Sequence, residues 1–75
     1  MMKKTVLFYT KENCPLCEEA KMLLELFCDD FEQRDIHDCD EWLLAYQLMI
    51  PVIVIDDEEL YGGRINYPTL GEKLN

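Results

Sequence analysis

A short apolar run leads directly into a pair of closely spaced cysteines. Residues 6–9 are apolar, 10–13 form a polar turn, and Cys14-Pro15-Leu16-Cys17 follows. Because proline lacks an N–H and has a φ suited to the first helical position, Pro15 predicts a helix that begins here. Cys14 would then be the N-cap, where amides and the helix dipole lower the pKa of a thiol, and Cys17 would lie close enough to form a disulfide with it. The stretch predicts a redox-active dithiol in which Cys14 is the more exposed and more acidic thiol.

Hydrophobic periodicity predicts the elements around this motif. Residues 5–9 show no polar alternation, which is typical of a central strand buried on both faces. Residues 31–36 carry several charges and suit an edge strand, where charge discourages pairing with another sheet. The helix between them is expected over 15–28, with one inward stripe made of Leu16, Ala20, Leu23, Leu24 and Phe27.

The second half of the chain predicts a helix, a hairpin and a last helix. Asp38 and Glu41 have the spacing of a capping box, which predicts a short helix through Tyr46 with Trp42, Leu43 and Tyr46 facing inward. The other expected elements are strands at 52–55 and 58–61, a turn at 56–57, and a helix at 68–74. The order is therefore β-α-β-α-β-β-α, which belongs to the α/β class.

Length and charge limit what the chain can do. Seventy-five residues are enough for a single domain, 1–75. The 16 acidic residues against 7 basic ones give a net charge of −9, which disfavours nucleic acid and anionic membrane surfaces. The first residues begin like a signal peptide, but the apolar run ends at Tyr9, short of a secretory core followed by small cleavage-site residues. No stretch approaches the roughly 20 apolar residues of a membrane span. We expect a cytoplasmic monomer.

Segments 9–17, 50–52 and 62–63 match a known family in their order and separation. The chain resembles glutaredoxins of the thioredoxin fold, in particular short bacterial glutaredoxin-like proteins of uncharacterised function. The resemblance implies a four-stranded mixed sheet, in the order 2-1-3-4, flanked by helices. It also implies that the Ile50–Pro51 bond is cis and faces the cysteines. The carbonyl and amide of Ile50 would then be left to pair with a substrate backbone.

The resemblance further implies thiol–disulfide exchange on protein or glutathione mixed disulfides. Glutaredoxins hold the carboxylates of glutathione with a basic residue before the first cysteine, a role that Lys11 fits, and with residues that follow a Gly-Gly pair. After Gly62 and Gly63 this chain has Arg64 in place of the family's small polar and acidic residues, so the partner of the γ-glutamyl amine is missing. The expected substrate-binding residues are Lys11, Ile50, Pro51, Gly62, Gly63 and Arg64. Glutathione is a candidate co-substrate, and no tightly bound cofactor is expected.

Acidic residues beside the motif act against this picture of glutathione binding. Glu12, Glu18 and Glu19 would repel an anionic tripeptide and would raise the pKa of Cys14 against the effect of the helix. The expected partners are therefore a disulfide-containing protein or glutathione, together with a reductase. Either glutathione or a flavoprotein reductase would return electrons to the dithiol.

Two other function classes remain open for the same residues. A binding module would use Cys14 to hold zinc or, with glutathione, an iron–sulfur cluster shared by two protomers. Cys28, His37 and Cys39 are further ligand types, but zinc ribbons usually pair Cys-x-x-Cys with a second such knuckle. A redox-silent interaction protein would keep only the fold. Metal content and a disulfide-reduction assay distinguish these classes from the enzyme.

Overall fold

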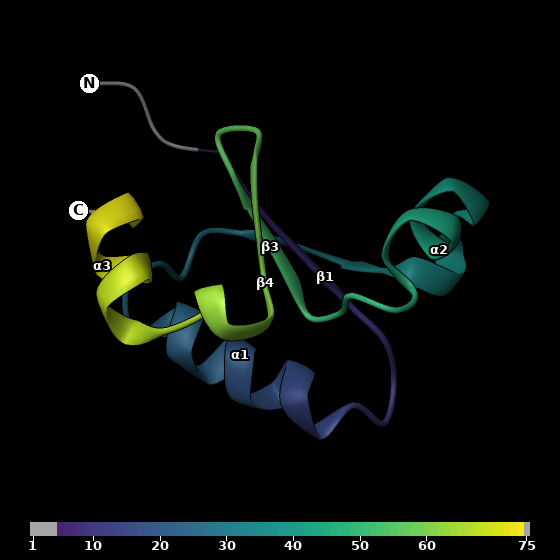
Figure 1. The fold of residues 1–75 in the computed structure, drawn as a ribbon, viewed down its shortest axis with the longest axis horizontal. Helices are drawn as coiled ribbons and strands as arrows, with labels where there is room; N and C mark the ends of the chain where they lie inside the picture. The colour runs from purple at the N-terminus through teal and green to yellow at the C-terminus, as the bar shows by residue number, and fades with distance from the viewer. Residues whose placement is uncertain (1–4, 75) are drawn as a thin grey trace.

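Four strands form one mixed sheet at the centre of the computed structural model, which describes residues 5–74 (Figure 1). The strands are β1 (Val6–Thr10), β2 (Glu32–Asp35), β3 (Val52–Ile55) and β4 (Glu58–Tyr61), in the order β2-β1-β3-β4. Strand β1 runs parallel to β2 and antiparallel to β3, and β4 is antiparallel to β3. The predicted strand order and mixed sheet are confirmed.

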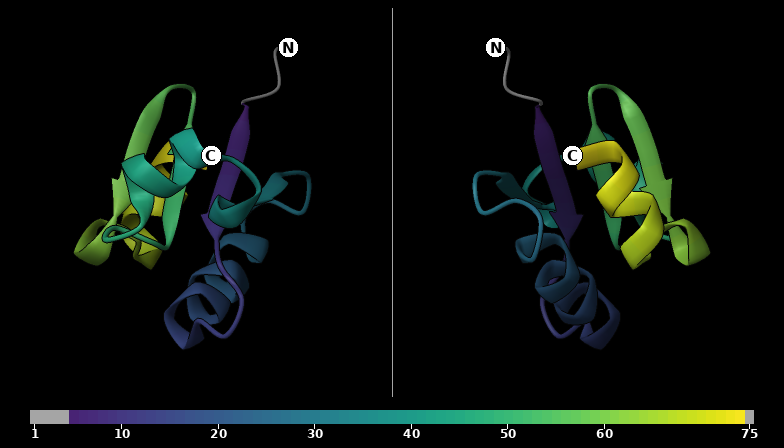
Figure 2. Two further views of the ribbon diagram at one scale, coloured as in Figure 1. Left: turned by 90° about the vertical axis from the view of Figure 1, so that its right-hand side faces the viewer. Right: turned by 90° about the vertical axis from the view of Figure 1, so that its left-hand side faces the viewer.

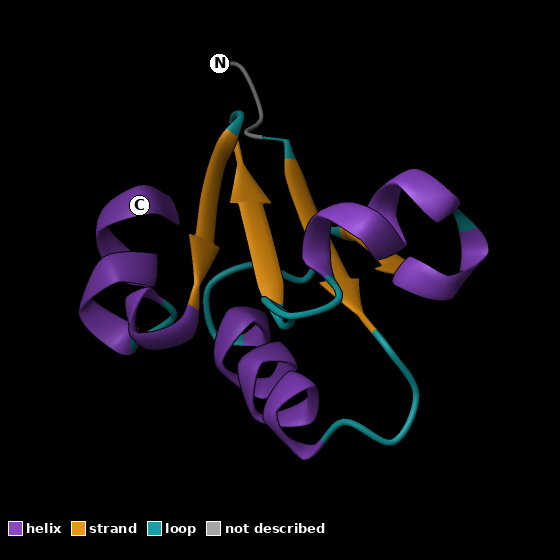
Figure 3. Ribbon diagram, turned by 45° about the vertical axis from the view of Figure 1, so that its right-hand side comes forward, coloured by secondary structure: helices purple, strands orange, loops and turns teal. Residues whose placement is uncertain are grey.

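Helices cover both faces of this sheet. They are α1 (Pro15–Glu25), α2 (Asp40–Tyr46) and α3 (Tyr67–Leu74), with 3-10 turns η1 (Ile36–Asp38) and η2 (Gly62–Arg64). Figures 2 and 3 show α1 and α3 together on one side and α2 on the other. No helix within residues 5–74 is long and apolar enough to cross a membrane.

Alternation along the strands divides the core into two parts, as expected for successive side chains of a strand. The α1-side core contains Val6, Phe8, Ile53 and Ile55 of the strands, together with both motif cysteines and residues of α1 and α3. The α2-side core contains Tyr9, Ile36, Val52 and Val54, with Trp42, Leu43 and Tyr46 packed against it. The inward face predicted for α2 is therefore confirmed, and β1 is buried on both faces as expected.

The hairpin between β3 and β4 turns at Asp56 and Asp57. Both residues have positive φ, 49° and 71°, as a two-residue turn of type I′ requires. Aspartate tolerates this region better than most residues. The turn predicted at 56–57 is confirmed, and it aligns Val52 with Tyr61 at the open end of the hairpin.

Two local predictions are wrong. Asp38 does not cap α2, because Ile36–Asp38 form the turn η1, whose own cap is the Asp35 carboxylate that accepts from the His37 amide at 2.9 Å. Cys39 is the N-cap residue of α2 and makes no side-chain capping bond. Leu16 does not face the core either; it is 63% exposed, and the buried residues of α1 are Cys17, Ala20 and Leu24.

Candidate functional site

The two motif cysteines lie where the loop after β1 enters α1. Cys14 is the N-cap residue, Pro15 occupies the first turn, and the Cys17 amide donates to Cys14 Sγ at 3.2 Å. The two cysteines form a disulfide with a Cα–Cα distance of 5.2 Å, inside the usual range. Cys14 is 9% exposed and Cys17 only 2%, so Cys14 is the more exposed residue of the pair, as predicted.

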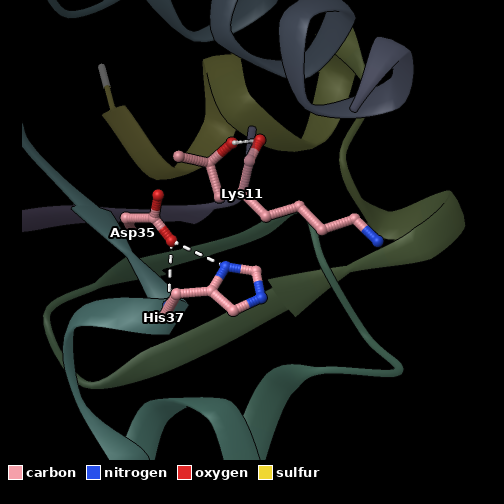
Figure 4. A network of polar contacts seen from close by, with 4 residues as sticks. Lys11, Asp35 and His37 are labelled. Carbon is pink, nitrogen blue, oxygen red and sulfur yellow. Dashed lines mark hydrogen bonds and ion pairs between the residues drawn. The ribbon is translucent and has the colours of Figure 1, made fainter. Parts of the chain in front are cut away.

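The loop before Cys14 owes its shape to Asn13. This residue has a φ of 57°, in the left-handed region that asparagine adopts more readily than most residues. Lys11 precedes it and is exposed. Figure 4 shows the Lys11 side chain extending away from Asp35, whose carboxylate accepts from the His37 amide and lies 3.1 Å from His37 Nδ1. Lys11 is therefore exposed and points away from the contact between Asp35 and His37.

The bond between Ile50 and Pro51 is cis, which confirms the prediction. Ile50 packs against the α1-side core that contains both motif cysteines. However, the Ile50 amide is not left for a substrate, because it donates to the Tyr46 carbonyl at 3.1 Å. That part of the prediction is wrong: the last turn of α2 continues far enough to bind this N–H.

The Gly-Gly segment forms the turn η2 at the end of β4. Gly62 has a φ of 58°, which glycine adopts at no steric cost. Arg64 Nη2 lies 3.2 Å from Glu58 Oε2, and Lys73 Nζ lies 2.8 Å from Glu58 Oε1. The hydrogen bond from Lys73, aided by the charges of Lys73 and Arg64, lowers the pKa of Glu58 from its usual value even though burial opposes this. Arg64 is therefore already paired with a carboxylate.

Asn66 has a structural role that its place after Arg64 conceals. Its Oδ1 accepts from the Thr69 amide at 2.8 Å, and its Nδ2 donates to the Gly63 carbonyl at 2.8 Å. The first contact is an N-cap of α3, and the second ties the cap to η2. Both polar atoms of the Asn66 side chain are therefore used to stabilise the junction between β4 and α3.

An apolar groove of about 600 Å³ includes Leu16, the residue between the two cysteines, in its wall, although neither cysteine lines it. Its walls come from the first turns of α1, the chain before β3 and the turn after β4. The lining residues are Leu16, Glu19, Ala20, Leu23, Leu48, Met49, Ile50, Pro51, Tyr61, Gly62 and Ile65. Of the expected substrate-binding residues, Ile50, Pro51 and Gly62 line this groove, whereas Lys11, Gly63 and Arg64 do not.

The sequence interpretation missed most of the groove. Leu48 is 94% exposed, and Leu16, which the helical pattern assigned to the inward stripe, is 63% exposed. Two signals were available: a leucine between the two cysteines, and apolar residues that continue past the end of α2 up to Pro51.

The remaining candidate ligands are not brought to the motif as one set. Cys28 Sγ lies 3.4 Å from the Asp30 carbonyl, and Cys39 is the N-cap residue of α2 on the other face of the sheet. Within residues 5–74, no three side chains of His, Cys, Asp or Glu form a group that would hold a metal ion.

Comparisons with known proteins agree with this arrangement. Residues 5–75 match the family model described as a glutaredoxin-like domain (DUF836). The crystal structure of a variant of the thioredoxin-like protein BC3987 is 25% identical, with a TM-score of 0.73, over 95% of this chain and 100% of that one. The glutaredoxin from Archaeoglobus fulgidus is 25% identical, with a TM-score of 0.69, over 93% of this chain and 85% of that one. The protein Ne2328 from Nitrosomonas europaea shares the fold at 22% identity and a TM-score of 0.74, over 100% of this chain and 95% of that one.

Proposed function

The chain belongs to the glutaredoxin-like domain family and has the thioredoxin-like fold, and from this we propose that it is a thiol–disulfide oxidoreductase whose reacting group is the Cys14–Cys17 pair. The observation that carries the proposal is the environment of Cys14: it is the N-cap residue of a proline-initiated helix, and its sulfur accepts the Cys17 amide. Such a site stabilises a thiolate, which is the nucleophile in disulfide exchange.

The reaction proceeds in two exchange steps. The Cys14 thiolate attacks one sulfur of a substrate disulfide; a Cys14–substrate disulfide forms, and the other substrate sulfur leaves as a thiolate that takes up a proton. Cys17 then loses its proton and attacks Cys14, which releases the second substrate thiol. Two electrons have passed from the dithiol to the substrate, and the protein is left with the Cys14–Cys17 disulfide. A dithiol reductant, glutathione or a reductase returns the two electrons.

The division of labour between the cysteines follows from their exposure. The more exposed Cys14 is the attacking thiol, while Cys17 is buried against the core and is close enough to resolve the intermediate. The groove beside them, with Ile50 and Pro51 in its wall, orients the substrate chain. Lys11 is exposed on the loop side and attracts an anionic group or the developing thiolate.

The test is disulfide reduction by the reduced protein and by two single variants. Cys14→Ser is expected to abolish turnover, and Cys17→Ser is expected to accumulate a mixed disulfide at Cys14 that intact-mass analysis detects. A matched control is Cys39→Ser, which lies on the other face of the sheet and is expected to retain the wild-type rate. If Cys14→Ser reduces substrate as fast as the wild type, the proposal is wrong. Metal content measured on the same preparation tests the binding-module alternative.

A further inference from the structure

The charge in the apolar groove is of one sign. Among the described residues that line it, Glu19 is the only charged one, and it stands on the exposed side of α1. The side chain of Glu19 makes no hydrogen bond or ion pair with another residue within 5–74. Glu18, in the first turn of α1, adds a second negative charge close by. A ligand in the groove therefore meets unneutralised negative charge and no lining cation.

The cation that follows the lining residue Gly62 in the chain is already paired with a carboxylate. Arg64 follows the lining residue Gly62, but its guanidinium is paired with Glu58 at 3.2 Å. Using Arg64 for a ligand carboxylate would require breaking this pair. The groove therefore offers little to an anionic ligand on this side of the cysteines.

Apolar side chains at the rim are left in water when the groove is empty. Leu48 is almost fully exposed, and Leu16 and Tyr61 are also exposed. They border a volume of about 600 Å³, within the range of pockets that enclose small ligands. Covering apolar area of this kind is favourable in proportion to the area removed from water. The groove is thus suited to an apolar side chain that contacts Leu16, the residue between the two cysteines.

We infer that this groove selects an extended protein segment that carries an apolar side chain adjacent to its reacting cysteine and a basic side chain nearby, and that it disfavours glutathione. The inference rests on the proposed function, because the segment is a substrate for the same cysteine pair. Leu16, Leu48 and Tyr61 contact the apolar side chain, and Glu19 attracts the basic one. Glutathione has no apolar side chain, and its two carboxylates outweigh its one amino group, so its net charge is negative and Glu19 disfavours it overall.

The test compares substrates that share one reacting bond. Two peptides, one with Leu-Cys-Arg and one with Gly-Cys-Glu at the centre, are each prepared as the mixed disulfide with 2-mercaptoethanol. Oxidised glutathione and 2-hydroxyethyl disulfide complete the set. We expect kcat/KM for the Leu-Cys-Arg peptide to exceed that for the Gly-Cys-Glu peptide and for glutathione by about tenfold or more, from apolar burial and charge together. Added salt is expected to remove only the share due to charge, since salt screens exposed charges.

Variants assign the preference to named residues. Leu48→Ser is expected to lower kcat/KM for the Leu-Cys-Arg peptide by about tenfold, because an apolar contact is lost. Its control is Leu44→Ser, an exposed leucine of α2 outside the groove, which is expected to leave the rate unchanged. Glu19→Gln is expected to lower the ratio of kcat/KM for the Leu-Cys-Arg peptide to that for the Gly-Cys-Glu peptide by roughly two- to fivefold. Its control is Glu25→Gln, at the far end of the same helix.

Each result decides one question. If 2-hydroxyethyl disulfide and all other substrates are left unreduced, the proposed function itself is overturned, and the inference falls with it. If 2-hydroxyethyl disulfide is reduced but glutathione reacts as fast as the Leu-Cys-Arg peptide, only the inference is overturned. Equal losses in Leu48→Ser and Leu44→Ser would also overturn it, because the groove would then have no special part in the preference.

Discussion

The hydrogen bond from the Cys17 amide to Cys14 Sγ can be removed without shortening α1. Cys17 is the third residue of the helix, where proline is tolerated, so Cys17→Pro deletes this one donor while Cys17→Ala keeps it. Both variants lack the resolving thiol and differ at the amide. We expect the pKa of Cys14 to lie below the free-thiol value of about 8.5 in Cys17→Ala, and to be higher in Cys17→Pro.

The size of the effect follows from the geometry. A hydrogen bond to a charged acceptor contributes roughly 1.5–3 kcal/mol, and the helix N-terminus adds about 0.3–1 kcal/mol. The negative charge of Glu18, in the same turn, disfavours the Cys14 thiolate, but Glu18 is exposed and its effect is therefore small. Because about 1.4 kcal/mol is a tenfold change in an equilibrium, the amide alone should raise the ratio of thiolate to thiol at Cys14 roughly ten- to hundredfold at a given pH.

The assay is the rate of alkylation by iodoacetamide as a function of pH. Cys28 and Cys39 are replaced by alanine in every protein, so that only Cys14 reacts, and circular dichroism checks that Cys17→Pro keeps the helix. Two results would refute the reasoning. One is the same pH midpoint in Cys17→Ala and Cys17→Pro, which would mean that the amide does not stabilise the thiolate. The other is a midpoint at or above about 8.5 in Cys17→Ala, which would mean that the helix start does not activate Cys14.

Three further predictions concern stability and charge. The pKa of Glu58 is lowered in the folded protein, so its contribution to stability is present above the ordinary value of 4.5 and is lost as pH falls through the lowered pKa. Urea titrations at each pH should therefore show that Glu58→Gln loses less stability than the wild type between neutral and acidic pH. Burial and the hydrogen bond to Glu59 raise the pKa of Tyr46 to about 12, so the contribution of Tyr46 to stability is present below pH 10.0 and is lost as pH rises through about 12. Tyr46→Phe should remove this loss of stability at alkaline pH, and phenolate absorbance of the wild type should show the late titration. Leu24 is fully buried, so Leu24→Ala should lower the free energy of unfolding by about 2–5 kcal/mol and Tm by about 10 °C or more in thermal scans. The control Met22→Ala, at an exposed position of the same helix, should change stability by less than about 0.5 kcal/mol.

The sheet was predictable because its signals are local and strong. The continuous apolar strands at 6–10 and 52–55 can be buried only at the centre of a sheet, and the Asp56–Asp57 pair marks the hairpin. Pro15 likewise marks the helix start, so the positions of both motif cysteines followed from the sequence. The cis bond before Pro51 followed from the family resemblance, since an isolated proline gives no such indication.

The groove was not predictable, because a helical pattern does not say what covers each face. Leu16, Ala20 and Leu23 share one side of α1, and all three line the groove, while Cys17 and Leu24 turn into the core beside them. A helical wheel shows one apolar stripe in both cases. Which part of the stripe meets protein and which part meets a ligand depends on where the chain before β3 and the turn after β4 lie, and these are tertiary contacts.

Capping failed as a predictor at Asp38 for a similar reason. Asp35 lies at the end of β2, where its carboxylate accepts from the His37 amide and begins the turn η1. Once that turn has formed, Asp38 is inside it and cannot also serve as the cap of α2. The N-cap position of α2 therefore falls to Cys39, which makes no side-chain capping bond.

The acidic residues at the start of α1 also bear on the direction of electron flow. A strongly stabilised thiolate makes a dithiol a weaker reductant, because stabilising the reduced form raises the reduction potential of the pair. The hydrogen bond from the Cys17 amide to Cys14 Sγ and the helix dipole both stabilise the thiolate and so make the pair more oxidising. Glu18 and Glu19 oppose this effect by disfavouring negative charge at Cys14. On the proposed function, these carboxylates would thus help the pair remain a reductant, and Glu19 would do so from the wall of the groove that we propose as the substrate site.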